Sequence, residues 1–161
     1  MRIIGIDPGL NVTGYGVVVV EGERCVHVHH GVVRTKPSEE RTARLVAIRD
    51  GVQALARQWS AEIGAIEASF VGTNPRSAMA LGEARAAAIL GLADAGLRVS
   101  EYAPAVVKQT VAGYGRGEKS QIAEMVRLQL SLATTPTPAD AADALAIAIT
   151  HWAHARLMAR I

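Results

Sequence analysis

Three short apolar segments, separated by turns, open the chain. The first covers residues 3–6, ends at Asp7 and precedes a Pro-Gly pair, a pattern typical of a buried strand that ends in a turn. Apolar residues, including four successive valines, continue over residues 13–21, and valines alternate with histidines within residues 24–35. Since only short turns separate the three segments, they are predicted to form an antiparallel meander.

The spacing of the apolar residues then changes to three and four. Between residues 38 and 60 this spacing predicts an amphipathic helix, whose apolar face consists of Leu45, Ile48, Val52, Leu55 and Trp59. Ser38 is the predicted N-cap of this helix, and Glu39 and Glu40, which follow it, suit the positive end of the helix dipole.

Strands and helices alternate in the remainder of the chain. Further strands are predicted over residues 63–69 and in the segment LRVSEYAP, and further helices over residues 75–95, 104–111, 118–132 and 138–160. The element order βββαβαβαα predicts an α/β fold with a mixed sheet and helices packed on it. A length of 161 residues fits a single domain over residues 1–161.

The composition narrows the class of protein. Half of the residues are hydrophobic but only 4% are aromatic, so the core is expected to consist of Ala, Val, Ile and Leu. No apolar stretch is long enough to span a membrane, and the first residues read as a strand and not as a signal peptide. The single cysteine, Cys25, fits a structural thiol in a reducing cytoplasm.

The predicted helix over residues 75–95 is rich in alanine and glycine. Small residues on a helix let a second element approach closely. Two partners are open at this point, the sheet of the same chain and a second copy of the chain. Glu83 and Arg85 lie on this helix without an assigned role.

Four acidic residues stand where apolar elements begin or end. Asp7 and Glu67 each close a short apolar strand, and open α/β sheets form their sites at the carboxyl ends of strands. Asp140 and Asp143 are three residues apart, so a helix would place them on one face. Alternatives remain for each acid taken singly, because Asp7 is also a typical turn residue and Asp143 also fits a partly solvated helix edge.

A cluster of these four acids would suit divalent cations. Mg²⁺ and Mn²⁺ prefer carboxylate oxygens, and two such ions about 4 Å apart can bind the attacking and leaving oxygens of a phosphodiester. Zinc is not favoured, because no cysteine or histidine accompanies the acids at ligand spacing. Apart from these acids, 11 acidic residues remain against 17 basic ones, a balance of +6 that suits a polyanion such as DNA.

Four motifs resemble those of the bacterial RuvC family, the crossover junction endodeoxyribonucleases that resolve Holliday junctions. They are GIDPGLNVTGYG, AIEASF, VKQTVAGYGRGEKSQI and ADAADALAIAITH, and together they extend over nearly the whole chain. The resemblance implies an RNase H-like fold with a central five-stranded mixed sheet, three antiparallel strands followed by parallel ones. It further implies a bacterial cytoplasmic homodimer that binds four-way junction DNA and nicks two strands of like polarity.

The resemblance also implies roles for individual residues. The catalytic acids and ligands of two Mg²⁺ ions, or of Mn²⁺, would be Asp7, Glu67, Asp140 and Asp143. Basic residues near the cut strand would be Lys108 and Lys119, with Arg116 as an additional DNA contact, and Phe70 would stack on a base. The products would carry 5′-phosphate and 3′-hydroxyl ends.

Other implications of the resemblance concern partners. The alanine-rich helix would form the dimer, and the RuvA–RuvB branch-migration complex would be a further partner. Residues 71–74 (VGTN) contain no basic residue, whereas better-known relatives have one at this place. The DNA contacts of this loop are therefore left open. His151 is expected to be a packed or capping histidine and not a ligand.

Two other functions compete with the nuclease. One is a module that binds junction DNA without cutting it, which the presence of all four acids disfavours. The other is a fragment of an actin-like ATPase, indicated only by the motif GIDPG, and 161 residues leave no room for the second lobe of that fold.

Overall fold

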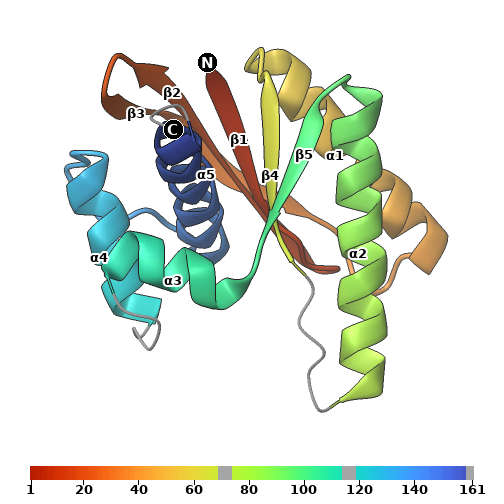
Figure 1. Ribbon diagram of the computed structural model, residues 1–161. Helices are drawn as coiled ribbons and strands as arrows, with labels where there is room; N and C mark the ends of the chain where they lie inside the picture. The colour runs from red at the N-terminus through yellow and green to blue at the C-terminus, as the bar shows by residue number, and fades with distance from the viewer. Residues whose placement is uncertain (69–73, 114–118, 159–161) are drawn as a thin grey trace.

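A five-stranded mixed sheet forms the centre of the structure, a computed structural model that describes residues 1–68, 74–113 and 119–158. The strands are β1 (Arg2–Asp7), β2 (Val12–Glu21), β3 (Arg24–Arg34), β4 (Ile63–Glu67) and β5 (Arg98–Tyr102). The first three are antiparallel neighbours, whereas β4 and β5 run parallel to β1 in the order β3-β2-β1-β4-β5 (Figure 1). This arrangement confirms the predicted mixed α/β sheet.

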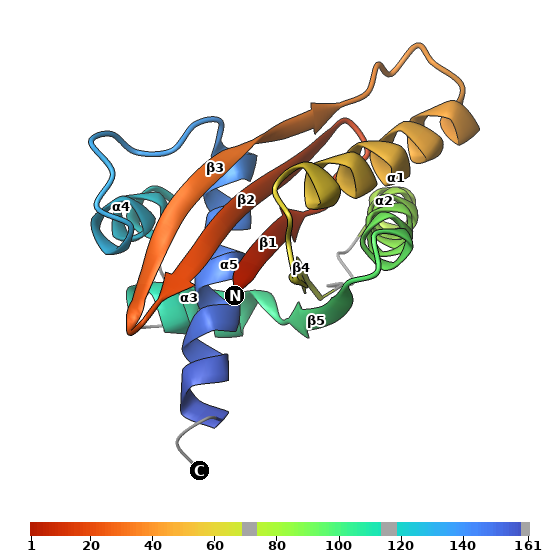
Figure 2. The same ribbon diagram turned by 90° about the horizontal axis from the view of Figure 1, so that it is seen from above.

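Helices cover both faces of the sheet. They are α1 (Arg41–Gln58), α2 (Pro75–Asp94), α3 (Pro104–Ala112), α4 (Lys119–Gln129) and α5 (Ala139–Met158). Figure 2 shows α1 and α2 on one side of the strands and α3, α4 and α5 on the other. Each side has its own apolar cluster, and both consist mainly of Ala, Val, Ile and Leu, as the composition predicts.

Helix α5 lies directly on the sheet because glycines on the facing strands leave room for it. A Cβ atom built on Gly5 of β1 would lie 2.1 Å from the carbonyl oxygen of Ala144, and one on Gly16 of β2 would lie 2.7 Å from the Leu145 side chain. Such distances are well inside van der Waals contact, so only glycine fits at these positions. The close seat explains why residues 144–150 of α5 are all buried.

The start of α1 differs from its prediction. The helix begins at Arg41, its N-cap is Glu40, and Ser38 does not cap it. Residues 36–39 form a tight turn instead, in which the Glu39 amide donates to the Lys36 carbonyl oxygen at 3.0 Å and the Glu39 carboxylate accepts from the Lys36 amide at 3.3 Å. The glutamate that was expected in the first turn of the helix therefore closes the turn before it.

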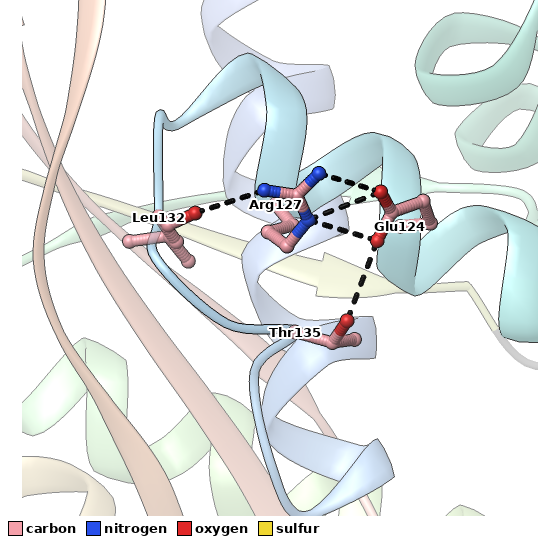
Figure 3. A network of polar contacts seen from close by, with 4 residues as sticks. All are labelled: Glu124, Arg127, Leu132 and Thr135. Carbon is pink, nitrogen blue, oxygen red and sulfur yellow. Dashed lines mark hydrogen bonds and ion pairs between the residues drawn. The ribbon is translucent and has the colours of Figure 1, made fainter.

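The end of α4 also differs from its prediction, since the helix stops at Gln129 and not at residue 132. Ser131 has a positive φ of 53°, which ends the helical path. Arg127 stabilises this end, because its guanidinium binds the Glu124 carboxylate at 2.7 Å and donates to the Leu132 carbonyl oxygen at 3.2 Å (Figure 3). Thr135 donates to the same carboxylate at 3.4 Å, which ties the connection toward α5 to α4.

The small residues of α2 pack inside the chain. Ala84, Ala87, Ala88 and Gly91 are buried, and a Cβ atom on Gly91 would lie 2.4 Å from the Arg49 carbonyl oxygen of α1. These four positions therefore pack within the chain, against its sheet and α1.

Two other expectations concern Cys25 and membrane spans. Cys25 is buried in β3, and burial raises the pKa of its thiol to about 12, in agreement with a structural thiol. Over the described part of the chain, we find no helix with the length and apolar character needed to cross a bilayer.

Candidate active site

Asp7 and Glu67 leave the sheet at the same edge. Asp7 is the last residue of β1 and Glu67 is the last residue of β4. The two strands are parallel neighbours in a register that pairs Ile6 with Ile66, so the acids follow paired residues. This confirms that the two acidic strand ends are adjacent, as expected for the carboxyl ends of an open α/β sheet.

A cleft of about 240 Å³ opens at this edge. Among the described residues, its polar lining consists of the acids Asp7, Glu67 and Asp143 and the basic residue Lys108. The remaining lining residues are apolar: Pro104, Val107, Ile122, Ala146 and Ile147. Helices α3, α4 and α5 therefore wall a site whose floor is the ends of β1 and β4.

Helix α5 brings the third acid to the cleft. Gly14 of β2 pairs with Asp7 of β1, and a Cβ atom on Gly14 would lie 2.0 Å from the carbonyl oxygen of Asp140. The first turn of α5 is therefore seated beside the strand end that carries Asp7. Asp143, three residues further along the helix, then lines the cleft.

Asp140 has a different place from the other three acids. It belongs to the first turn of α5, and its main chain contacts Gly14, but it is not among the residues that line the cleft. On an α-helix, residues three apart differ in direction by about 60° and in height by about 4.5 Å. The structure thus brings three of the four predicted acids to one cleft and the backbone of the fourth beside it.

Among the described residues that line the cleft, acids outnumber bases. Their side chains are three carboxylates and one ammonium group, and like charges that share a site disfavour one another unless a cation compensates them. Carboxylate oxygens are the donors that Mg²⁺ and Mn²⁺ prefer, so the chemistry of this donor set fits a hard divalent cation. Within residues 1–68, 74–113 and 119–158, no three His, Cys, Asp or Glu side chains lie close enough together to bind one metal ion as they are placed.

One contact at the site was not predicted from the sequence. The Nε atom of Arg85, on α2, donates to the main-chain carbonyl oxygen of Glu67 at 3.0 Å. Its terminal nitrogen binds the Glu101 carboxylate of β5. The sequence gives no signal for this contact, because helix periodicity does not reveal which strand end an arginine will reach.

The other predicted site residues are described only in part. Lys119 is the first residue of α4, but its side chain lies outside the described residues, as do Phe70 and Arg116 entirely. Of the loop over residues 71–74, only Asn74 is described. Its side chain caps α2 by accepting hydrogen bonds from the backbone amides of Arg76 and Ser77 in the first turn of the helix.

His151 has a structural partner. Its Nδ1 atom lies 2.8 Å from the Tyr102 hydroxyl oxygen, which joins α5 to β5. This agrees with a packed histidine, and His151 does not line the cleft.

Comparison with known proteins gives one consistent match. The family model described as crossover junction endodeoxyribonuclease RuvC matches residues 3–151. The RuvC of Burkholderia thailandensis is 51% identical over 151 residues, which cover 94% of this chain and 83% of that protein. The RuvC of Burkholderia mallei is 50% identical over the same shares of both chains.

Solved structures agree with this match. Thermus thermophilus RuvC superposes with a TM-score of 0.89 at 38% identity, covering 98% of this chain and 97% of that chain. The same protein in complex with Holliday junction substrate gives a TM-score of 0.92 at 38% identity, covering 98% and 96%. The yeast mitochondrial Holliday junction resolvase Ydc2 shares the fold alone, with a TM-score of 0.67 at 12% identity over 98% of this chain and 82% of that chain.

Proposed function

Since the chain belongs to the RuvC family of crossover junction endodeoxyribonucleases, we propose that it resolves Holliday junctions by paired, symmetric nicking through the cleft at the ends of β1 and β4. The observation that carries the proposal is the convergence of Asp7, Glu67 and Asp143 on that one cleft. The junction-bound relative supports the substrate, because it matches this chain over nearly its full length.

The family consists of metal-dependent nucleases, and we assign the metal site to the acids of the cleft. Asp7, Glu67 and Asp143, with Asp140 beside them, would hold two Mg²⁺ ions, and Mn²⁺ has the same ligand preference. When bound, such ions activate a water molecule and stabilise the departing 3′ oxygen. Binding would require the carboxylates to rotate toward a common centre.

The remaining chemistry falls to the chain itself. Lys108 lies in the same cleft as the acids, so its ammonium group can neutralise a phosphate that enters beside them. Hydrolysis would leave 5′-phosphate and 3′-hydroxyl ends, which a ligase can join. The DNA contacts assigned to Phe70, Arg116 and Lys119 rest on the family resemblance.

We further propose that the active form is a homodimer. Its support is an apolar groove of about 290 Å³ between α1 and α2, lined by Leu45, Val46, Ala86, Ala87 and Leu90 among others. Val46 and Leu90 are 46% and 55% exposed in the single chain, so a second copy on this groove would remove apolar surface from water. Two copies would also supply two sites for the two equivalent strands of a junction.

The family resemblance supports two further assignments. The cytoplasm is the compartment in which a nuclease of this kind meets junction DNA. The RuvA–RuvB branch-migration complex is the partner that would deliver the junction.

A cleavage experiment tests the proposed function. A synthetic four-way junction and a linear duplex of the same sequence are incubated with the protein in Mg²⁺, in Mn²⁺ and in EDTA. We expect paired nicks in the junction alone, and none in EDTA. Tight junction binding without nicks in either metal would contradict the proposal and favour the non-catalytic junction-binding module.

A further inference from the structure

Arg85 of α2 reaches across to the end of β4. Its side chain is only 15% exposed although arginine is usually a surface residue. The Nε atom donates to the Glu67 carbonyl oxygen at 3.0 Å, and a terminal nitrogen binds the Glu101 carboxylate on β5. One guanidinium therefore joins α2 to the ends of two neighbouring strands.

The peptide group between Glu67 and Ala68 is held on both sides. Arg85 donates to the Glu67 carbonyl oxygen of this group. The Ala68 N–H of the same group donates to the Tyr102 carbonyl oxygen at 2.8 Å. A peptide group is planar, so fixing both of its polar atoms fixes the ψ angle of Glu67. The direction in which the Glu67 side chain leaves the backbone is fixed with it.

This geometry matters at the last residue of a strand. The residues of β4 before Glu67 pair with both neighbouring strands, β1 and β5. Glu67 itself pairs only with Tyr102 of β5, because the pairing with β1 ends at Ile66. Arg85 supplies a bond at the position where that ladder stops. Its planar fork reaches two acceptors at once, which a lysine ammonium on a flexible stem does not reproduce.

We infer that Arg85 is a positioning residue for Glu67. By fixing the peptide group that follows Glu67, Arg85 holds the Glu67 carboxylate toward the cleft. The inference rests on the proposed role of Glu67 as a metal ligand. Groups that orient a ligand typically change metal affinity by about 10- to 100-fold when they are removed.

The test compares four variants of the full chain. Arg85→Gln removes the fork, and Arg85→Lys keeps the charge and one donor. Glu101→Gln keeps an acceptor for Arg85 and leaves the bond to the Glu67 carbonyl intact. Arg57→Gln is the matched control, because Arg57 also reaches from α1 to α2, where it donates to the Asp94 carbonyl oxygen at 3.0 Å, and lies outside the groove assigned to the dimer.

Two readouts do not depend on cleavage. The first is hydrogen exchange of the Ala68 amide, which Arg85→Gln should accelerate by about tenfold or more as the peptide group is released. The second is the rise in Tm that Mn²⁺ produces without DNA, which reports metal affinity. We expect Arg85→Gln to need about tenfold more Mn²⁺ for the same rise, with Arg85→Lys intermediate.

Cleavage then completes the comparison. At saturating junction, Arg85→Gln should require more metal for half-maximal nicking, whereas Glu101→Gln and Arg57→Gln should resemble the wild type. The inference is overturned if Arg85→Gln leaves the Ala68 exchange and the Mn²⁺ response unchanged, or if Glu101→Gln has the same effect as Arg85→Gln. Failure of the proposed function looks different, because the wild type itself would then not nick the junction.

Discussion

Gly14 of β2 touches the main chain of Asp140, since a Cβ atom at Gly14 would lie 2.0 Å from the Asp140 carbonyl oxygen. Gly14 is also the register partner of Asp7 on β1. Beside Gly5 and Gly16, this third position without a side chain therefore lets the helix that carries Asp143 approach the strand end that carries Asp7. The acids reach one cleft because the backbone of α5 can approach this closely.

Replacing that glycine tests the relationship. Gly14→Ala should lower the free energy of unfolding by about 1–3 kcal/mol, because α5 must move away from the new methyl group. It should also slow junction nicking, because Asp143 moves with the helix. Chemical denaturation and a nicking time course measure the two effects.

Gly82→Ala is the control for this substitution. Among the described residues, no heavy atom outside the helix's own backbone lies within 4 Å of a Cβ atom built on Gly82, in the middle of α2. Alanine there should therefore raise the free energy of unfolding by about 1 kcal/mol. Wild-type stability and nicking in Gly14→Ala would contradict the account of how α5 is seated.

Much of the fold follows from local patterns in the sequence. The strands, the helices and the acids that close β1 and β4 were predicted because each depends on periodicity, turn residues or an out-of-place charge. The start of α1 was predicted wrongly, because Glu39 satisfies the turn at Lys36 instead of the helix.

The remaining features depend on contacts between residues far apart in the chain. The contact between Gly14 and Asp140 joins residues that only the packing of α5 brings together. Arg85 likewise reaches Glu67 through the placement of α2 and not through any motif. Single-sequence patterns carry no information on such long-range distances, so these parts of the site could only be seen in the structure.

Lys108 should matter more for nicking than for binding. Lys108→Gln removes the one basic side chain among the described residues that line the cleft, so the charge that develops on the phosphate loses a partner. We expect the nicking rate at saturating junction to fall by about 100-fold. Rate constants and junction Kd values should be measured together.

Lys36→Gln provides the matched control for Lys108, since Lys36 is exposed in the turn before α1 and away from the cleft. Its nicking rate should stay close to that of the wild type. An equal loss in both variants would indicate that only overall charge matters, contrary to the assigned role of Lys108.

The histidines of β3 and α5 should make stability depend on pH. Burial lowers the pKa of His27, His30 and His151 below the ordinary value of 6.5, and neighbouring histidines lower it further. The unfolded chain therefore binds protons first as the pH falls through about 6.5. The free energy of unfolding is therefore highest above that pH, where these histidines are neutral in both states. It decreases as the pH falls toward the folded-state pKa values.

Urea denaturation between pH 7.5 and 5.5 measures this dependence. The free energy of unfolding should decrease toward the acidic end, and His30→Gln should flatten the curve, because it removes one partner of the contact between His27 and His30 at 2.8 Å. An unchanged slope in that variant would contradict the role of the pair.

Cys25 should react slowly in the folded protein. Burial raises the pKa of its thiol to about 12, so little thiolate forms at pH 8. A disulfide reagent such as DTNB should label the native protein only at the rate of unfolding and label the unfolded chain at once. Because Cys25 is the only cysteine, the whole signal reports on it, and rapid labelling of the native state would show that the thiol is accessible.

The substitution Asp7→Asn tests the central claim most directly, because it keeps the shape of the side chain at the end of β1 and removes one charge from the cleft. Nicking of a four-way junction and the Kd for that junction are measured in the same Mg²⁺ buffer. The account predicts that nicking is abolished while the Kd stays equal or decreases, since a negative charge beside the DNA is gone. Nicking at a near wild-type rate would show that the acids at the ends of β1 and β4 are not the metal-binding centre of this nuclease.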